Sequence, residues 1–279
     1  MNGFKTFILI TGMTALLVVI GSLWMGNTGV VLALGVGLLL NGVSYFFSDR
    51  IVLAMYRARV IDQAQAPQLY AIVANLTQRA GLPMPRIAII PDETPNAFAT
   101  GRNPDHAVVA VTEGIMRVLN RAELEGVIAH ELGHVKNRDI LIGSLASVLA
   151  QAIMFISHMA IWFTPRDDEG RPNPIAGILI YILGPLAAML LQMAISRSRE
   201  YMADAYSAHL TGRPDMLASA LQRIAGYNAE VPMRNAEPAT AHMMIVNPLS
   251  GGGIFSLFST HPPMAKRIER LNAMPVEAR

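Results

Sequence analysis

Hydrophobic residues in this chain fall into long uncharged runs separated by more polar stretches. Residues 6–25 and 28–47 are two such runs, with Gly-Asn-Thr at positions 26–28 as the turn between them. Residues 140–163 and 174–194 are two more runs without a charged residue. Each run is long enough to cross a hydrocarbon core of about 30 Å as a helix. The pattern therefore predicts about four transmembrane helices arranged in two hairpins.

Each hairpin has an alternative interpretation. The first run resembles a signal peptide in length, but a second long run follows almost at once and no small-residue cleavage site stands out, which favours a membrane anchor. The hairpin at residues 140–194 has the alternative of being buried within a soluble domain. Spans of 18 or more residues with few or no charges favour the membrane.

Positive charges set the expected orientation of both hairpins. The residues that flank the outer ends of the hairpins are Lys5, Arg50, Arg57, Arg59, Lys136, Arg138, Arg197 and Arg199. The turn at residues 26–28 contains no Lys or Arg. Because Lys and Arg accumulate on the cytoplasmic side, both termini and the segments between the hairpins are expected in the cytoplasm.

The first polar stretch shows shorter periodic patterns. Pro67 begins a helix with apolar residues at helical spacing, which Gly81 ends. Residues 86–91, 96–100 and 106–112 read as three strands bounded by turn residues. A small sheet is therefore expected just before the next helix.

After the second hairpin, residues 196–211 and 215–225 are expected to form helices. A last helix should begin near Pro263, and residues 228–253 read as a long loop. The expected fold is thus an α+β membrane protein with a small β-sheet in its cytoplasmic domain. The chain is expected to divide into an N-terminal transmembrane hairpin at residues 1–50 and a cytoplasmic domain in two halves, at residues 51–139 and 195–279. The second hairpin, at residues 140–194, separates the two halves.

Composition narrows the class of protein further. Charged residues make up 15% of the chain and apolar residues 52%, whereas charged residues in soluble domains average about 25%. The chain contains no cysteine and has a net charge of +2. Disulfides and thiolate metal sites are therefore excluded, and nucleic acid is not an expected partner.

The chemistry centres on the sequence His130-Glu131-Leu132-Gly133-His134. Two histidines four residues apart lie on one face of a helix and can reach one metal ion, while Glu131 can act as the general base of a metalloprotease. Asn120 as N-cap and Glu123 at the third helical position form a capping box, so a helix over residues 121–136 is expected.

Two glycines in this helix are unusual choices. Gly126 and Gly133 each cost about 1 kcal/mol relative to alanine in a helix interior. A close neighbouring element at each position would explain them.

A catalytic zinc ion takes three protein ligands and keeps a fourth position open. Glu200 is the preferred third ligand, since Asp204 follows it four residues later on the same helical face. Asp204 is then placed to accept the free N–H of a ligand histidine and fix its tautomer. The rival carboxylates all lie upstream, at Glu113, Glu123 and Glu125.

Four motifs together resemble the HtpX-type membrane zinc metalloproteases, within the gluzincin group that includes the prenyl-protein (CAAX) endopeptidases. The motifs, in order along the chain, are Pro95-Asn96-Ala97-Phe98-Ala99, His130-Glu131-Leu132-Gly133-His134, Ser198-Arg199-Glu200-Tyr201-Met202-Ala203-Asp204, and Thr260-His261-Pro262-Pro263 with Arg267.

This resemblance implies a zincin-like fold, one zinc ion held by His130, His134 and Glu200, and Glu131 as the catalytic residue. It also implies a bacterial inner-membrane endopeptidase whose active site faces the cytoplasm. Its substrates would be damaged or misassembled membrane proteins, which connects it to the stress response and protein quality control.

Three weaker sites are also expected. Asn96, Ala97 and Phe98 lie in a strand whose open edge is suited to binding an extended substrate. His261 and Arg267 are candidates for stabilising negative charge at the reaction centre. The loop at residues 228–253 is a candidate cover for the cleft.

Two rival functions remain open at this point. A prenyl-protein endopeptidase would use the same chemistry, but such proteins resemble longer chains with more spans. A membrane chaperone or adaptor that retains an inactive zinc-site fold belongs to another class. The intact Glu131 argues against it, because an inactive relative is free to lose its base.

Overall fold

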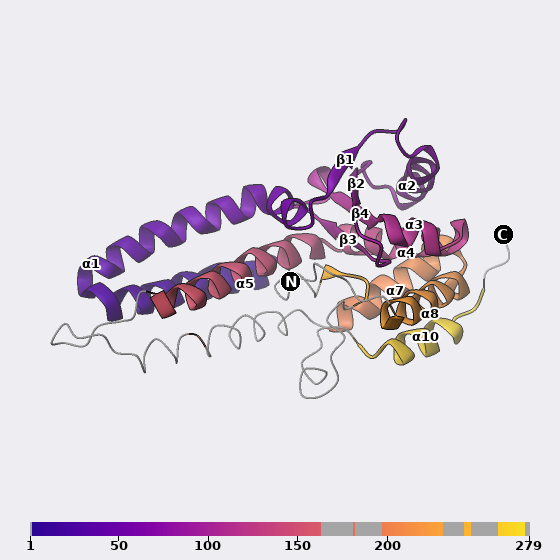
Figure 1. Ribbon diagram of the computed structural model, residues 1–279. Coiled ribbons are helices and arrows are strands. Elements are labelled where there is room, and N and C mark those ends of the chain that lie inside the picture. The colour runs from indigo at the N-terminus through magenta and orange to yellow at the C-terminus, as the bar shows by residue number, and fades with distance from the viewer. Residues whose placement is uncertain (1, 163–180, 182–196, 231–242, 247–261, 277–279) are drawn as a thin grey trace.

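The computed structural model describes residues 2–162, 181, 197–230, 243–246 and 262–276. Long helices extend from one end of a mixed α/β body, giving the molecule an elongated shape (Figure 1). The predicted span at residues 174–194, His261 and most of the expected loop at residues 228–253 lie outside the described residues.

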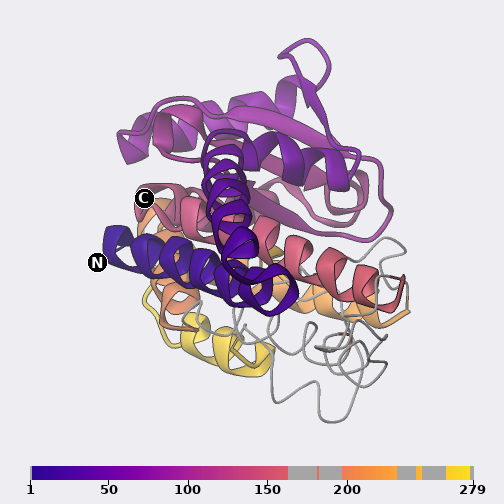
Figure 2. The ribbon, with the colours of Figure 1, turned by 90° about the vertical axis from the view of Figure 1, so that its left-hand side faces the viewer.

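The N-terminal helix α1, Asn2–Met55, is broken at Gly26, where φ is 58° and ψ is −138°. The break turns the helix back on itself, and the two arms form a hairpin beside α5, Asp139–Trp162 (Figures 1 and 2). Nδ2 of Asn41 donates to Oγ1 of Thr14 at 3.0 Å across the arms. The predicted turn at Gly26 is confirmed. Among the described residues, the segment Gly26–Met55 is the one helix long and apolar enough to cross a membrane.

A four-stranded sheet forms one layer of the body, in the order β1-β2-β4-β3. The strands are β1 (Arg59–Ile61), β2 (Arg86–Ile90), β3 (Ala97–Thr100) and β4 (Val108–Thr112). The central pair β2–β4 is parallel, and both outer strands are antiparallel to their neighbours. Three strands are as predicted. The sequence did not indicate β1, because three residues are too few to show an alternating pattern.

The helices of the body pack against this sheet and against one another (Figure 1). They are α2 (Pro67–Ala80), α3 (Glu113–Val118), α4 (Arg121–Lys136), α7 (Arg197–Thr211), α8 (Pro214–Glu230) and α10 (Met264–Asn272), with the short 3-10 helix η1 (Pro104–His106). Helix α8 continues to Glu230, so three residues expected in the loop are helical.

Helix α4 is the centre of the body. The predicted capping box is present: Asn120 accepts the backbone N–H of Glu123, and Glu123 accepts that of Asn120, both at 3.0 Å. Most of α4 is buried, including its apolar residues Leu124, Val127, Ile128, Leu132 and Val135. Because α4 is covered on nearly all sides, its position is fixed by packing rather than by one amphipathic face.

The two glycines of α4 allow its neighbours to approach closely. A Cβ atom at Gly126 would lie 3.1 Å from the backbone nitrogen of Leu217 in α8, and one at Gly133 would lie 3.2 Å from Cα of Ala203 in α7. Oγ of Ser207 in α7 also donates to the carbonyl of Gly126 at 2.7 Å. The expectation of a close neighbour at each glycine is confirmed.

Strand β3 connects the body to the long helices. The rings of Phe98 and Tyr56, which directly follows α1, have centroids 5.6 Å apart. The hydroxyls of Thr100 and Ser144, the latter in α5, are 2.7 Å apart. The sheet edge nearest the site is therefore held by both apolar helices.

Candidate metal centre and active site

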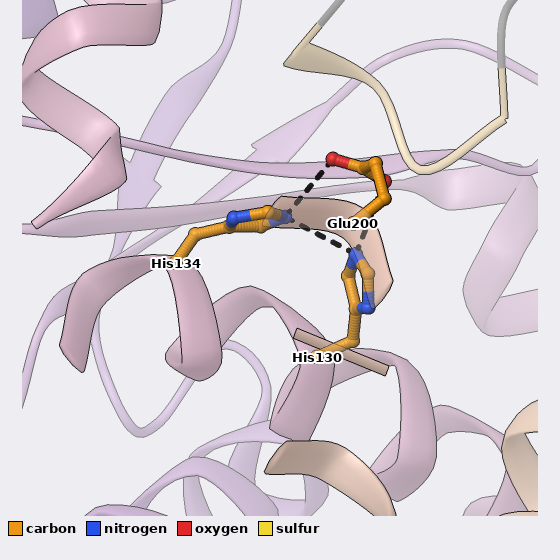
Figure 3. A group of neighbouring side chains, drawn as sticks. All are labelled: His130, His134 and Glu200. Atoms are coloured by element: carbon orange, nitrogen blue, oxygen red, sulfur yellow. Dashed lines mark hydrogen bonds and ion pairs between the residues drawn. The ribbon is translucent and has the colours of Figure 1, made fainter. Parts of the chain in front are cut away.

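Three side chains from two helices converge at one point. His130 and His134 come from α4 and Glu200 from the first turn of α7 (Figure 3). Nε2 of His130 and Nε2 of His134 are 3.2 Å apart. The carboxylate of Glu200 lies 3.5 Å from Nε2 of His134 and 3.7 Å from Nε2 of His130. One ligand atom from each of the three residues lies within 4.8 Å of the others.

The crossing of α4 and α7 produces this convergence. One helical turn separates the histidines, so both imidazoles leave the same face of α4. Gly133 lies between them in sequence and lets α7 pack against the helix at Ala203, three residues after Glu200. The close approach of the two helices brings a carboxylate of α7 to the imidazoles.

His130 is supported from behind by a carboxylate and a guanidinium. Its Nδ1 lies 2.9 Å from Oδ1 of Asp204. Arg267, in α10, donates to both carboxylate oxygens of Asp204 at 2.9 and 2.7 Å and to the carbonyl of Ile245 at 2.9 Å. Both Arg267 and Asp204 are buried. A proton held at Nδ1 by this contact leaves the Nε2 lone pair available to a metal ion.

His134 has a looser support. Its Nδ1 lies 3.5 Å from Oδ2 of Asp139, the first residue of α5. Nε of Arg199 lies 3.6 Å from Oδ1 of the same carboxylate. Arg138 makes the corner between α4 and α5 with a left-handed φ of 58°, and this turn directs Asp139 back toward the site.

These surroundings move the pKa values of the two histidines apart. Burial lowers the pKa of His130, and the neighbouring Asp204 carboxylate only partly opposes this. Burial also acts to lower the pKa of His134, but the carboxylates of Asp139, Glu200 and Glu131 together raise it to about 9. In the metal-free protein, a proton near neutral pH therefore resides on His134 rather than on His130.

Glu131 lies between the histidines in sequence and is buried beside the cluster. Its Oε1 accepts no hydrogen bond among the residues that the structure describes. Burial raises the pKa of its carboxyl to about 7, while His134 and the backbone N–H of Ala99 in β3 act to lower it. A buried carboxyl with a pKa near neutrality and a free oxygen is suited to receiving and returning a proton.

The donor set fits a zinc ion. Two ligands bound to zinc at about 2.0–2.1 Å in tetrahedral geometry lie about 3.3–3.4 Å apart, close to the 3.2 and 3.5 Å measured from Nε2 of His134 to His130 and Glu200. Each histidine also turns its other ring nitrogen to a carboxylate, the arrangement typical of zinc ligands. Three ligands leave a fourth position beside Glu131.

The rival carboxylates lie elsewhere. Glu123 is engaged at the start of α4, where it accepts from Ser219 at 2.6 Å and pairs with Arg223 at 2.9 Å. Glu125 pairs with Arg79 at 3.8 Å, and Glu113 is exposed at the start of α3. Among the described residues, Glu200 is the carboxylate grouped with the two histidines.

The expected substrate strand is partly occupied by the chain itself. β3 is at the edge of the sheet, as predicted, but the carbonyl of Ala97 accepts the N–H of Ile245 at 3.0 Å. The side chain of Asn96 donates to the carbonyl of Val246 at 3.0 Å, and Phe98 is buried against Tyr56. Asn96, just before β3, and Ala97 and Phe98 within it therefore contact the chain's own segments.

Arg267 approaches the metal cluster, as the sequence predicted, and its Nη1 lies 3.5 Å from Glu200. Its shortest contacts are with Asp204 and Ile245 behind His130, so the guanidinium is largely engaged by the protein. A direct role for Arg267 at the reaction centre stays a prediction. His261 lies outside the described residues.

Sequence reasoning missed two residues that line the site, Asp139 and Arg199. Asp139 follows His134 by five residues, across a helix break that no local pattern indicates. Arg199 directly precedes Glu200, and the sequence indicates it only as a charge at the end of the hairpin and as a member of the motif at residues 198–204. Its adjacency to the third ligand was the one available signal.

Comparisons with known proteins agree with this geometry. Residues 63–275 match the model of peptidase family M48. A protein named protease HtpX homolog from Desulfatibacillum aliphaticivorans is 54% identical over 97% of this chain and 89% of its own length. Another of the same name from Ralstonia pickettii is 53% identical over 98% of this chain and 96% of its own length.

The crystal structure of S. mikatae Ste24p is a weaker likeness, with a TM-score of 0.48 and 20% identity over 84% of this chain and 58% of the other. The assignment does not depend on it. The family model and the two relatives cover the cluster, its supporting residues and the sheet beside it. The chain belongs to peptidase family M48 and is a metalloprotease.

Proposed function

We propose that this metalloprotease is a zinc-dependent endopeptidase in which His130, His134 and Glu200 hold the metal and Glu131 is the catalytic residue. The observation that carries the proposal is the triangle of donor atoms with the free oxygen of Glu131 beside it. Asp204 would hold the imidazole of His130 in the orientation that presents Nε2 to the metal.

When bound, zinc would supply Lewis-acid polarisation of the peptide carbonyl and of water. Glu131 would accept the proton of the attacking water and later deliver it to the leaving amine. Burial suits this residue to both tasks, because a pKa of about 7 lets the carboxyl exchange a proton near neutral pH. Ala99 would orient the carboxyl through its backbone N–H.

The test compares the wild type with Glu131→Gln, purified in detergent and loaded with zinc. The amide has the shape of the carboxylate but cannot take the proton, so casein cleavage should fall by about 10²–10⁴-fold. Zinc content, measured by elemental analysis, should stay at one ion per chain. Equal cleavage by the two proteins would instead support a chaperone or adaptor with an inactive zinc-site fold.

The prenyl-protein endopeptidase remains the alternative within the same chemistry. The relatives that align with nearly the whole chain are named protease HtpX homolog, which favours the broader endopeptidase. A farnesylated CAAX peptide and an unmodified peptide of equal length distinguish the two. Cleavage restricted to the farnesylated peptide would overturn our assignment.

We further propose that the protein is a multi-pass bacterial inner-membrane protein with about four transmembrane helices in two hairpins. Support comes from the helical hairpin of α1, the apolar helix α5 beside it and the positions of Lys and Arg. The proposed divisions are residues 1–50, 51–139, 140–194 and 195–279, with both termini and the active site in the cytoplasm.

This location suits a role in the quality control of damaged or misassembled membrane proteins. The metal cluster lies beside the start of α5, so a substrate embedded in the bilayer would reach it at the membrane surface. Labelling a cysteine introduced at Asp168 tests the orientation. Reaction with an impermeant reagent from outside the cell is expected, whereas labelling only after cell lysis would contradict the second hairpin.

We also propose that an extended substrate pairs with β3 at Ala99 rather than at Ala97, whose carbonyl is already bonded to Ile245. Ala99 lines the cavity that contains the metal ligands. Ala99→Pro would disturb both this pairing and the contact of the Ala99 N–H with Glu131. A folded Ala99→Pro protein with normal peptide cleavage would therefore contradict pairing there.

A further inference from the structure

Arg199 is a buried guanidinium that faces the cavity of the site. Only 4% of the residue is exposed, yet it lines the cavity together with His130, His134 and Glu200. Its Nε is paired loosely with Asp139 at 3.6 Å. Its Nη2 has no hydrogen-bond partner within the described part of the chain.

An unpartnered donor of this kind needs an explanation. Leaving a buried polar group unsatisfied costs about 1–3 kcal/mol, and more when the group is charged. Native proteins therefore leave few such groups, and those that remain are often found where a ligand completes the bonding. Arg267, the other buried arginine at the site, has its donors directed at Asp204 and Ile245.

The chemistry of the unpartnered Nη2 group limits what the ligand can be. Nη2 is a positively charged donor, so its partner is an acceptor oxygen. Burial lowers the pKa of Arg199, and the carboxylates of Asp139 and Glu200 beside the guanidinium only partly oppose this. An arginine nevertheless stays charged near neutral pH, and its Nη2 is a donor that no acceptor among the described residues uses.

We propose that Nη2 of Arg199 donates a hydrogen bond to the carbonyl oxygen of the scissile peptide bond and stabilises the negative charge that forms there. This inference rests on the proposed endopeptidase function. As the water oxygen bonds to the carbonyl carbon, its proton passes to Glu131 and the carbonyl π electrons move onto the oxygen. When that pair returns, the C–N bond breaks and the amine takes the proton from Glu131.

Asp139 and Arg199 have different roles in this proposal. Asp139 pairs with Nε of Arg199 at 3.6 Å, and Arg199 lines the cavity, so Asp139 acts as a positioning residue for the guanidinium. Arg199 acts as a catalytic residue, because it touches the reacting oxygen. A donor fixed before the reaction is effective because it requires no reorganisation as charge develops.

The first experiment compares Arg199→Ala with Arg213→Ala in the full-length, zinc-loaded protein. Arg213 is an exposed arginine between α7 and α8 that pairs with Asp215 at 2.7 Å, so its removal makes the same chemical change away from the site. Losing one oxyanion donor lowers kcat by about 10²–10³-fold. That loss is expected for Arg199→Ala with little change in KM, and wild-type turnover is expected for Arg213→Ala.

Conservative and rescue variants separate chemistry from folding. Arg199→Lys keeps the charge and one donor, so it should recover part of the lost turnover, whereas Arg199→Gln should not. Added guanidinium should accelerate Arg199→Ala but not Glu131→Gln. Zinc content of each variant should match that of the wild type, and any decrease in Tm should be no larger than expected for the loss of one loose ion pair.

A binding measurement gives a readout that does not depend on activity. In a Glu131→Gln background, a phosphinic peptide mimics the tetrahedral oxygens, and the matching amide peptide mimics the substrate. Arg199→Ala should weaken the phosphinic peptide at least tenfold and the amide peptide by less than about threefold, since the bond strengthens as charge forms.

Three results would overturn the proposal: normal turnover of Arg199→Ala, equal weakening of both peptides, or loss of zinc that accounts for the lost turnover. Failure of the proposed function itself looks different. In that case the zinc-loaded wild type would cleave no peptide, or would cleave it no faster than Glu131→Gln.

Discussion

The two candidate zinc-binding histidines are each backed by an aspartate and an arginine, but the two supports are built differently. Behind His130, Asp204 is in hydrogen-bond contact at 2.9 Å and Arg267 binds both oxygens of that carboxylate. Behind His134, Asp139 lies 3.5 Å from Nδ1 of the imidazole, and Nε of Arg199 lies 3.6 Å from the same carboxylate. One support is a closed hydrogen-bond network, and the other is a loose ion-pair chain.

The difference separates two tasks that an active site must perform. The closed network contains a fully buried guanidinium whose bonds all go to the protein, so it holds His130 and α10 in place. In the loose chain, Nη2 of Arg199 has no hydrogen-bond partner among the described residues, and Arg199 lines the cavity. Rigidity on one side and an available donor on the other give the site both a fixed metal position and a group for the substrate.

Replacing the two arginines should give the largest difference between the two supports, in the free energy of unfolding. Arg267→Met leaves Asp204 as a buried charge without its partner, which costs about 3–5 kcal/mol of unfolding free energy. Arg199→Met removes only a 3.6 Å ion pair, so its loss of stability should be less than half as large. Denaturant unfolding of the zinc-free proteins measures both changes. Similar losses for the two variants would show that the supports are equivalent.

Replacing the two aspartates should have the next largest effect, this time on zinc affinity. Removing a carboxylate behind a ligand histidine typically weakens metal binding 10–100-fold. That range is expected for Asp204→Asn, and a smaller loss is expected for Asp139→Asn because its contact is longer. Competition with a fluorescent zinc chelator measures both affinities. A greater loss of zinc affinity in Asp139→Asn would show that His134, rather than His130, has the more rigid support.

Proton release on zinc binding should show the smallest of the three effects. With a pKa of about 9, His134 in the metal-free protein is largely protonated at pH 8, whereas Glu131, with a pKa of about 7, is largely ionised. Zinc must displace the His134 proton, so about one proton should be released per ion at pH 8. Apparent affinity should then fall about tenfold for each pH unit below 9.

Calorimetry in buffers of different ionisation enthalpy counts these protons. In Asp139→Asn the number should decrease, because a carboxylate that raises the pKa of His134 is gone. In Asp204→Asn it should stay near one, since His130 carries no proton at this pH. An unchanged count in Asp139→Asn would show that Asp139 does not set the protonation of His134.

Local patterns in the sequence were sufficient to predict much of the fold. The capping box at Asn120 and Glu123 fixes the start of α4, and the break at Gly26 follows from the turn residues between two apolar runs. Spacing of four residues places His130 and His134 on one face. These features depend on residues close together in the chain, so periodicity and capping chemistry reveal them.

The parts that could not be predicted depend on contacts between distant segments. Strand β1 exists because β2 pairs with it, and its three residues carry no signal of their own. Arg267 and Asp204 meet only through the packing of α10 against α7. Asp139 reaches His134 through the left-handed turn at Arg138, a conformation that a non-glycine residue rarely adopts and that sequence does not indicate.

The glycines of α4 have a consequence for how this protein tolerates mutation. A methyl group at Gly126 or Gly133 would meet the backbone of Leu217 or Ala203 at 3.1–3.2 Å, so it would push α8 or α7 outward. In a library of random variants, Gly133 should be depleted nearly as strongly as the histidines on either side of it, although it has no side chain. A position without a side chain can thus be constrained by selection because two helices must approach closely there.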